Sequence, residues 1–171
     1  MVTAAQDERL EPGFVRLEAS VRSRAAPDAV ASVLAGGMNA WLPDAQPRSG
    51  PEGLDRHAVD LRLRVGGDEA GITTFKKAAF VDLGPLRSAG RGYAAEIAWQ
   101  ATSAAPLFPV FSGRLLVEPG ELRIEGIYAP PGGPVGRIAD RVLLHLAANA
   151  TARWLLRELE EAARSPIASA T

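Results

Sequence analysis

The longest periodic pattern of apolar and polar positions in the chain lies near its C-terminus. Between Val135 and Ala163 the only glycine is Gly136, and the good helix formers Ala, Leu, Arg and Glu dominate. Apolar residues recur at steps of three and four, which predicts one wide apolar helix face. The residues of this predicted face are Leu143, Leu144, Ala147, Ala150, Thr151, Trp154, Leu155 and Leu159. A helix of about 30 residues is about 45 Å long, so it must cross the whole body of a domain of this size.

Both borders of this helix carry signals in the sequence. It is preceded by Pro130-Pro131-Gly132-Gly133, which cannot continue a strand ladder, and Pro134 suits the first helical position. Its opposite side is polar, and there Glu160 and Arg164 stand four residues apart in the order that favours an ion pair. The predicted polar side consists of Arg141, His145, Asn149, Arg153, Glu160 and Arg164.

Alternation of apolar and polar residues predicts strands in most of the remaining chain. A first strand at 14–22 is followed by a short helix through Leu34, with Pro27 near its first turn, and by a second short helix from Met38 to Leu42. Five more strands are predicted at 58–65, 72–83, 93–100, 110–118 and 121–129. Gly and Pro mark the segments between the elements as loops or turns, which are expected at 44–55, 66–68, 84–90 and 101–107.

This order of elements predicts an α+β fold. Strands joined by brief turns are antiparallel neighbours, and one helix covers six strands only if the sheet is strongly curved. We therefore expect a curved antiparallel sheet of about six or seven strands wrapped round the long C-terminal helix, with two short helices after the first strand. The length of 171 residues fits a single domain at 14–164, with a flexible N-terminal tail at 1–13 and a C-terminal tail at 165–171.

Charge and cysteine content exclude several classes of function. The chain has 19 basic and 20 acidic residues, and this balance argues against nucleic acid as a partner. The absence of cysteine excludes disulfides, thiol nucleophiles and cysteine metal sites. No apolar run approaches 18 residues and the N-terminus carries no secretion signal, so we expect a cytoplasmic protein without a membrane-spanning segment.

One segment carries a resemblance to a known family. The stretch from Gly126 to Gly136, GIYAPPGGPVG, with Asp140 and the apolar helix after it, resembles the last strand and helix of uncharacterised bacterial START/Bet v 1-like proteins. Phe108-Pro109 ahead of a strand and the order of elements over 14–164 are similar too. The resemblance to this helix-grip superfamily (SRPBCC, polyketide cyclase-like) implies a cavity between sheet and helix that holds a lipid-like, polyketide-like or other apolar molecule. Its members include binding proteins, lipid carriers, cyclases and dehydratases, so the fold leaves the activity open.

The large side chains expected near such a cavity are our candidate ligand-binding residues. From the strands and loops these are Trp41, Phe75, Trp99, Phe111 and Tyr128, and from the long helix Leu143, Ala147 and Thr151. Core packing alone would also explain them, since aromatic residues fill protein interiors in general. Tyr128 is the best single candidate because its hydroxyl needs a partner if it is buried.

Catalytic and metal sites leave fewer signals. Glu96, Gln100, Arg123 and Glu125 are expected on the solvated outer face of the sheet, although an inward carboxylate would suit a base with a raised pKa. His57 and His145 have no convergent ligands, so we expect neither a metal site nor a cofactor. Ser112 has no recognisable base, so no catalytic triad is predicted.

Two functions therefore remain open after the sequence. The first is the binding or transport of a small hydrophobic molecule. The second is an enzyme of the cyclase or dehydratase type, which would use Tyr128 or an inward carboxylate for proton transfer. A protein-binding adaptor has no specific support, and the oligomeric state cannot be read from the sequence.

Overall fold

The chain folds around one sheet and one long helix. The computed structural model describes residues 14–42, 44–65, 73–102, 110–129 and 138–165, without the side chains of 62–65, 73–77 and 138–144. The expected turn at 66–68, most of the loop at 101–107 and the Pro130–Pro134 helix start lie outside the described residues. The described elements are β1 (Val15–Arg22), α1 (Pro27–Ala35), the 3-10 helix η1 (Met38–Ala40), β2 (Gln46–Arg48), β3 (Asp55–Val65), β4 (Thr73–Leu83), β5 (Arg87–Ala89), β6 (Gly92–Ala101), β7 (Val110–Glu118), β8 (Glu121–Ala129) and α2 (Ile138–Arg164).

The eight described strands form one antiparallel sheet. Their order is β1-β8-β7-β6-β4-β3-β2, and β5 also pairs with β6. β4 pairs with the second half of β6, where Leu83 lies opposite Ile97, and β5 pairs with the first half, where Arg87 lies opposite Ala94. The two are thus one partner strand of β6 that is interrupted at Pro85, a residue that has no N–H to offer a ladder.

The sequence prediction missed two strands in this sheet. Residues 44–55 and 84–90 were expected to be loops, but they contain β2 and β5. Both strands have three residues, and all of these residues are exposed. A fully exposed strand of this length has no apolar alternation, which is why the pattern could not reveal it.

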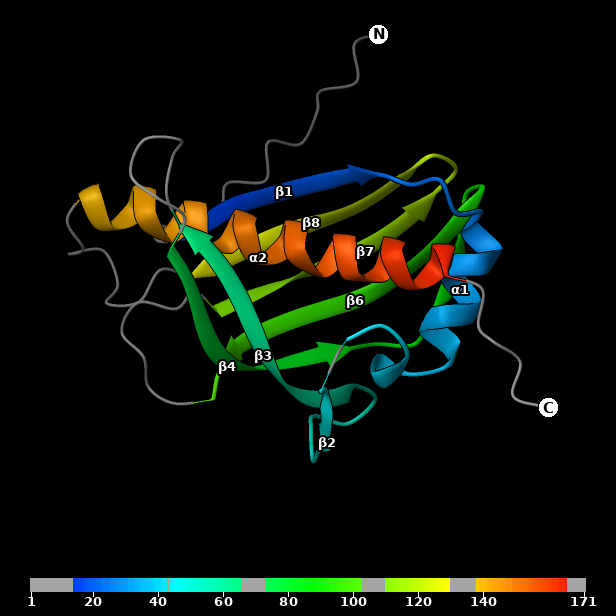
Figure 1. The fold of residues 1–171 in the computed structure, drawn as a ribbon, viewed down its shortest axis with the longest axis horizontal. Coiled ribbons are helices and arrows are strands. Elements are labelled where there is room, and N and C mark those ends of the chain that lie inside the picture. Colours follow the sequence, from blue (N-terminus) through cyan, green and yellow to red (C-terminus); the bar gives the residue numbers. More distant parts are fainter. Residues whose placement is uncertain (1–13, 43, 66–72, 103–109, 130–137, 166–171) are drawn as a thin grey trace, which may run out of the picture.

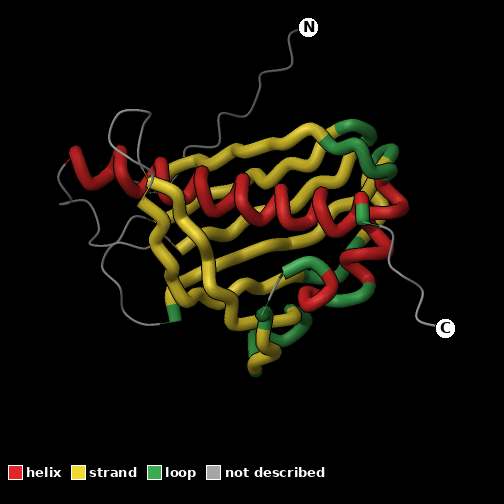
Figure 2. The backbone as a smooth tube through the Cα atoms, viewed as in Figure 1, coloured by secondary structure: helices red, strands yellow, loops and turns green. Residues whose placement is uncertain are grey.

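The sheet curls around α2, as Figure 1 shows. The helix packs most extensively against β1 at one end of the strand order and against β3 near the other end. α1 packs against α2, β6 and β7, and it closes the end of the molecule where α2 finishes (Figure 2). This confirms the predicted α+β helix-grip fold, with eight strands in place of six or seven.

Two opposed glycines let the middle of the sheet hold large rings. Gly113 on β7 and Gly126 on β8 are direct partners in the register. A Cβ atom at Gly126 would lie 2.3 Å from the carbonyl oxygen of Ser112 and 2.8 Å from the ring of Phe111. No side chain fits there, and the Phe111 ring occupies the space instead. Mid-strand glycine, which normally weakens a strand, here allows close approach.

The buried face of α2 overlaps the predicted one only in part, because Thr151, Leu155 and Leu159 are buried as predicted and the others are not described or are less buried. Its buried residues are Ala148, Thr151, Ala152, Leu155, Leu156 and Leu159. Ala147, Ala150 and Trp154, which were predicted to lie on the apolar face, are only half-buried. Alanines occupy both sides of this part of the helix, and because alanine is small it does not distinguish a buried face from an exposed one.

The predicted ion pair between Glu160 and Arg164 is wrong. Glu160 instead accepts hydrogen bonds from the Ser23 hydroxyl (2.6 Å) and from the backbone N–H of Arg24 (2.8 Å). Arg164 lies 4.0 Å from Glu161. The chain leaves β1 at this point with a backbone donor that needs an acceptor, and this long-range demand outweighs a weak pair on the helix surface. The contact ties the end of α2 to the end of β1.

Candidate functional site

The strand register places six residues in one line across the concave face of the sheet. Each is the direct partner of the next, from β1 through β8, β7, β6 and β4 to β3. We call them the inner row: Val15, Tyr128, Phe111, Trp99, Val81 and His57. The buried residues beside them on the same strands, such as Ile97 and Val59, show that this alternation faces α2.

The centre of the inner row is a pair of stacked aromatic rings. The ring centroids of Trp99 and Phe111 lie 3.9 Å apart, and the ring planes are inclined by 16°. Each residue is only 1% exposed. The sequence singled out both residues, and the structure brings them together on neighbouring strands. Whether they contact a ligand stays a prediction.

Tyr128 extends the inner row towards α2. It is also 1% exposed, and its hydroxyl lies 3.3 Å from Nδ1 of His145, an exposed residue of the helix. Burial raises the pKa of the Tyr128 hydroxyl above its ordinary value, because the phenolate would lose its hydration. The sequence indicated that Tyr128 needs a partner but missed His145. The two residues are on different elements, β8 and α2, and they meet only because α2 packs against the sheet.

Several buried nitrogens have no hydrogen-bond partner in the described part of the chain. They are Nε1 of Trp41, Nε1 of Trp99, Nδ1 of His57 and Nε of Arg123. The Arg123 guanidinium is paired through its other nitrogens, with Glu118 at 3.2 Å and Glu18 at 3.6 Å. The two indoles have a single donor each, so their hydrogen-bonding capacity is wholly unused.

The structure says less about the role of the other predicted site residues. Trp41 follows η1 and is 4% exposed. Thr151 is buried on α2, and its hydroxyl donates to the carbonyl oxygen of Ala147 at 2.9 Å, so it is satisfied within the helix. Phe75 lies in β4 and Leu143 in α2, but their side chains lie outside what the structure describes.

The inner row is closely covered by protein. Exposed fractions near 1% mean that Trp99, Phe111 and Tyr128 contact other side chains on nearly all sides. A ligand reaches these rings only if the side chains that cover them move.

The two ends of the fold differ in how firmly they are closed. At one end, α1 is held to β6 by the 2.6 Å hydrogen bond from Tyr93 to Asp28. At the other end, Phe14, which precedes β1, and Val110, the first residue of β7, are exposed.

Charged side chains lie on the outer face of the same strands, as the sequence predicted. Arg114 pairs with Glu125 at 2.7 Å, and Arg123 bridges to neighbouring carboxylates. Asp82 is the exception in burial, since it is 5% exposed and accepts two hydrogen bonds from Arg56, at 2.7 and 2.8 Å. These bonds raise the pKa of the Arg56 guanidinium. The charge of this buried carboxylate is therefore fully compensated.

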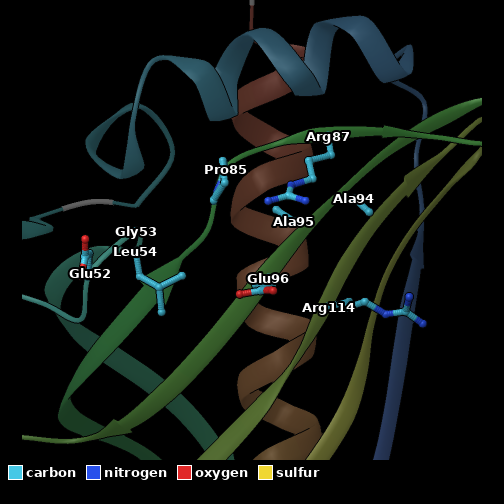
Figure 3. A pocket seen from close by; sticks show the side chains of 9 residues that line it. All are labelled: Glu52, Gly53, Leu54, Pro85, Arg87, Ala94, Ala95, Glu96 and Arg114. Atoms are coloured by element: carbon cyan, nitrogen blue, oxygen red, sulfur yellow. The ribbon is translucent and has the colours of Figure 1, made fainter.

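Two adjoining clefts open on this outer face. Figure 3 shows the larger one, with α2 behind the sheet, so that the cleft and the helix lie on opposite sides. The volumes are about 460 and 360 Å³, and Leu54, Glu96 and Arg114 line both clefts. Glu96 lies exposed in this cleft and not in the interior, so the sequence alternative of Glu96 as an inward base is wrong.

Metal and membrane features were sought over the same residues. Within the described ranges no three His, Asp or Glu side chains are grouped so that they could hold a metal ion. Among the helices described, none combines the length and the apolar character that crossing a membrane requires.

The chain was compared with family models, curated proteins and solved structures. No protein-family model matches the chain, and no curated protein matches it. Among solved structures, it is similar to a STAR-related lipid transfer protein from Xanthomonas axonopodis, with 19% identity over 85% of this chain and 83% of that chain. The TM-score is 0.39, and at this level the similarity says nothing about what this chain binds.

Proposed function

We propose that this protein binds or transports a small hydrophobic molecule, lipid-like or polyketide-like, between the concave face of the sheet and α2. The proposal includes a cytoplasmic location and no cofactor. The observation that carries it is the inner row, in which the stacked rings of Trp99 and Phe111 lie next to Tyr128 across three neighbouring strands. Binding sites for apolar ligands are typically lined by aromatic side chains with a few polar groups among them.

Two exposed apolar residues lie at the end of the sheet near Tyr128. Phe14 precedes Val15, the partner of Tyr128, and Val110 is the partner of Ala129, so both residues lie at this end. They are 40% and 51% exposed. Val110 alternates with inward Phe111 and so belongs to the outer face, which means that this pair borders the end of the sheet and does not line the interior. The α1 end is held by the hydrogen bond from Tyr93 to Asp28, so we expect a ligand to enter at the end near Tyr128.

The test is the intact mass of freshly purified protein under native conditions and after denaturation. We expect a small molecule that is present in the first spectrum and lost in the second. A bare mass in both spectra, together with no uptake of the neutral probe N-phenyl-1-naphthylamine, would contradict the proposal.

A pair of variants separates the interior from the outer clefts. Trp99→Phe reduces a ring of the inner row, and Leu54→Ala changes a side chain that lines both outer clefts. We expect the affinity for the probe to change in the first variant and to remain at the wild-type value in the second. The reverse result would place the site on the outer face.

One contact favours a second candidate function, a cyclase or dehydratase type of enzyme acting in the same space. The Tyr128 hydroxyl, 3.3 Å from Nδ1 of exposed His145, is placed to give a proton to a substrate oxygen and to recover one through the histidine. Tyr128→Phe separates the two functions. Loss of turnover with ligand affinity retained supports the enzyme, and binding without any turnover in the wild-type protein supports the carrier.

A further inference from the structure

The unpaired indole groups of the interior indicate what the ligand carries. Trp41 and Trp99 are 4% and 1% exposed, and neither Nε1–H finds an acceptor in the described part of the protein. An indole N–H is a donor only, and buried donors in proteins are nearly always paired. Two such donors in one small domain therefore need an acceptor that the described protein does not supply.

The register places the Trp99 indole and His57, whose Nδ1 is also unpaired, on the same row. His57 lies two strands from Trp99 in the inner row, with Val81 between them, which is about 10 Å across the sheet. Trp41 belongs to the connection that runs on to β2, and Pro47 of β2 is the direct partner of His57.

A water molecule is a poor candidate for the missing acceptor at Trp99. Ordered buried waters usually make two to four hydrogen bonds, but the partners of Trp99 in the register are Phe111 and Val81, which offer none. A ligand oxygen differs from water here, because the apolar remainder of the ligand packs against these same side chains, to which a water molecule cannot hydrogen-bond.

The charges around the row indicate a neutral acceptor. Arg56 and Asp82 are bonded to each other and lie on the outer face, in the alternation opposite to His57 and Val81. The titratable groups described on the inner row are His57 and Tyr128, with His145 above Tyr128. Lys77 shares the alternation of Val81 and lies opposite Leu61, but its side chain lies outside the described residues. Among the side chains described on the inner face there is no arginine or lysine to balance a buried carboxylate, whose burial without a partner is costly.

We propose that the inner row selects apolar molecules that carry a carbonyl oxygen, which accepts a hydrogen bond from the Trp99 indole N–H and is further bound by Trp41 or His57. This inference rests on the proposed function and defines its ligand class. It adds a requirement to apolar character, since a hydrocarbon of the same shape leaves both indole donors unpaired.

Matched pairs of probes test this directly on the full-length chain. Benzophenone and diphenylmethane differ in one carbonyl group, and so do 2-undecanone and undecane. We expect the ketone of at least one pair to bind about tenfold more tightly than its hydrocarbon, the effect of one buried hydrogen bond. In Trp99→Phe, which keeps an aromatic ring but has no N–H, the ratio should fall close to one, whereas Trp154→Phe on half-buried Trp154 should keep the wild-type ratio.

A second measurement on the unmodified protein avoids any loss of folding. The chain has three tryptophans, so an amide correlation spectrum shows three indole signals. We expect the ketone to move the Trp99 indole proton downfield and the hydrocarbon to leave it in place. Equal affinities within both pairs would overturn this inference and leave the hydrophobic-ligand proposal standing. Binding of no probe, together with a bare native mass, would overturn both.

Discussion

The two faces of the same strands differ in how well their polar groups are paired. On the outer face, charged groups are paired, as in the doubly bonded Arg56 and Asp82 and in Arg114 with Glu125. On the inner face, the Trp99 indole N–H is buried against apolar side chains and has no partner among the described residues. A protein that satisfies charges on one side of a strand is able to satisfy a neutral donor on the other. The difference indicates that the ion pairs of the outer face stabilise the fold, and it supports the proposal that the inner face binds a ligand.

The largest expected effect comes from the glycine pair that supports the inner row. In Gly126→Ala the new methyl group would lie 2.3 Å from a strand carbonyl oxygen, and backbone cannot move aside cheaply. We expect a loss of about 3–5 kcal/mol in the free energy of unfolding, or failure to fold. Urea denaturation measures it, with exposed Ser112→Ala as control. A loss below about 1 kcal/mol would show that the sheet is less tightly paired here than described.

The buried ion pair should matter more than the exposed ones on the same face. Asp82→Ala leaves Arg56 without its partner, and we expect a loss of about 3 kcal/mol in the free energy of unfolding. Glu125→Ala removes the partner of exposed Arg114 and should cost less than about 1 kcal/mol. Equal effects in thermal or urea denaturation would remove the distinction between buried and exposed charges on this face.

The contact between the ends of α2 and β1 offers a matched pair of adjacent residues. Glu160→Ala removes the acceptor of Ser23 and of the Arg24 N–H, and we expect a loss of about 1–2 kcal/mol. Glu161→Ala, one residue on, removes only a 4.0 Å contact with Arg164 and should be nearly neutral. If both variants unfold at the same urea concentration, Glu160 does not hold the two elements together.

The smallest effect is a dependence on pH from the inner face. The pKa of Tyr128 is raised by burial, so the folded protein keeps the phenol protonated above pH 10, where an unfolded chain begins to lose the proton. The corresponding stability is present below about pH 10 and is lost as the pH rises through the folded pKa. Absorbance at 295 nm in Tyr93→Phe follows Tyr128 alone, since the chain has two tyrosines. Ionisation of the folded protein near pH 10 would contradict its burial.

The sequence predicted the fold well because the fold is built from strong local patterns. The alternation in β7 and β8 placed both strands at their observed bounds, Val110–Glu118 and Glu121–Ala129. The three-residue strands β2 and β5 were missed because they are wholly exposed. The buried face of α2 was predicted only in part, at Thr151, Leu155 and Leu159, because its alanines leave the period ambiguous.

The candidate site was only partly accessible from sequence. Tryptophan, phenylalanine and tyrosine at inward positions were predicted as interior residues, and Trp99, Phe111 and Tyr128 are buried side by side. Their arrangement in one row depends on strand register, which local patterns do not encode across β6, β7 and β8. The contact between Tyr128 and His145, and the unpaired nitrogen of His57, depend on tertiary packing and gave no signal in the sequence.

The most direct test of the central claim is an experimental electron-density map of protein purified from its native host. The account predicts continuous density between α2 and the ring stack of Trp99 and Phe111, with an oxygen within hydrogen-bonding distance of the Trp99 Nε1. An interior filled by protein side chains alone, with no density beside the inner row, would contradict the claim.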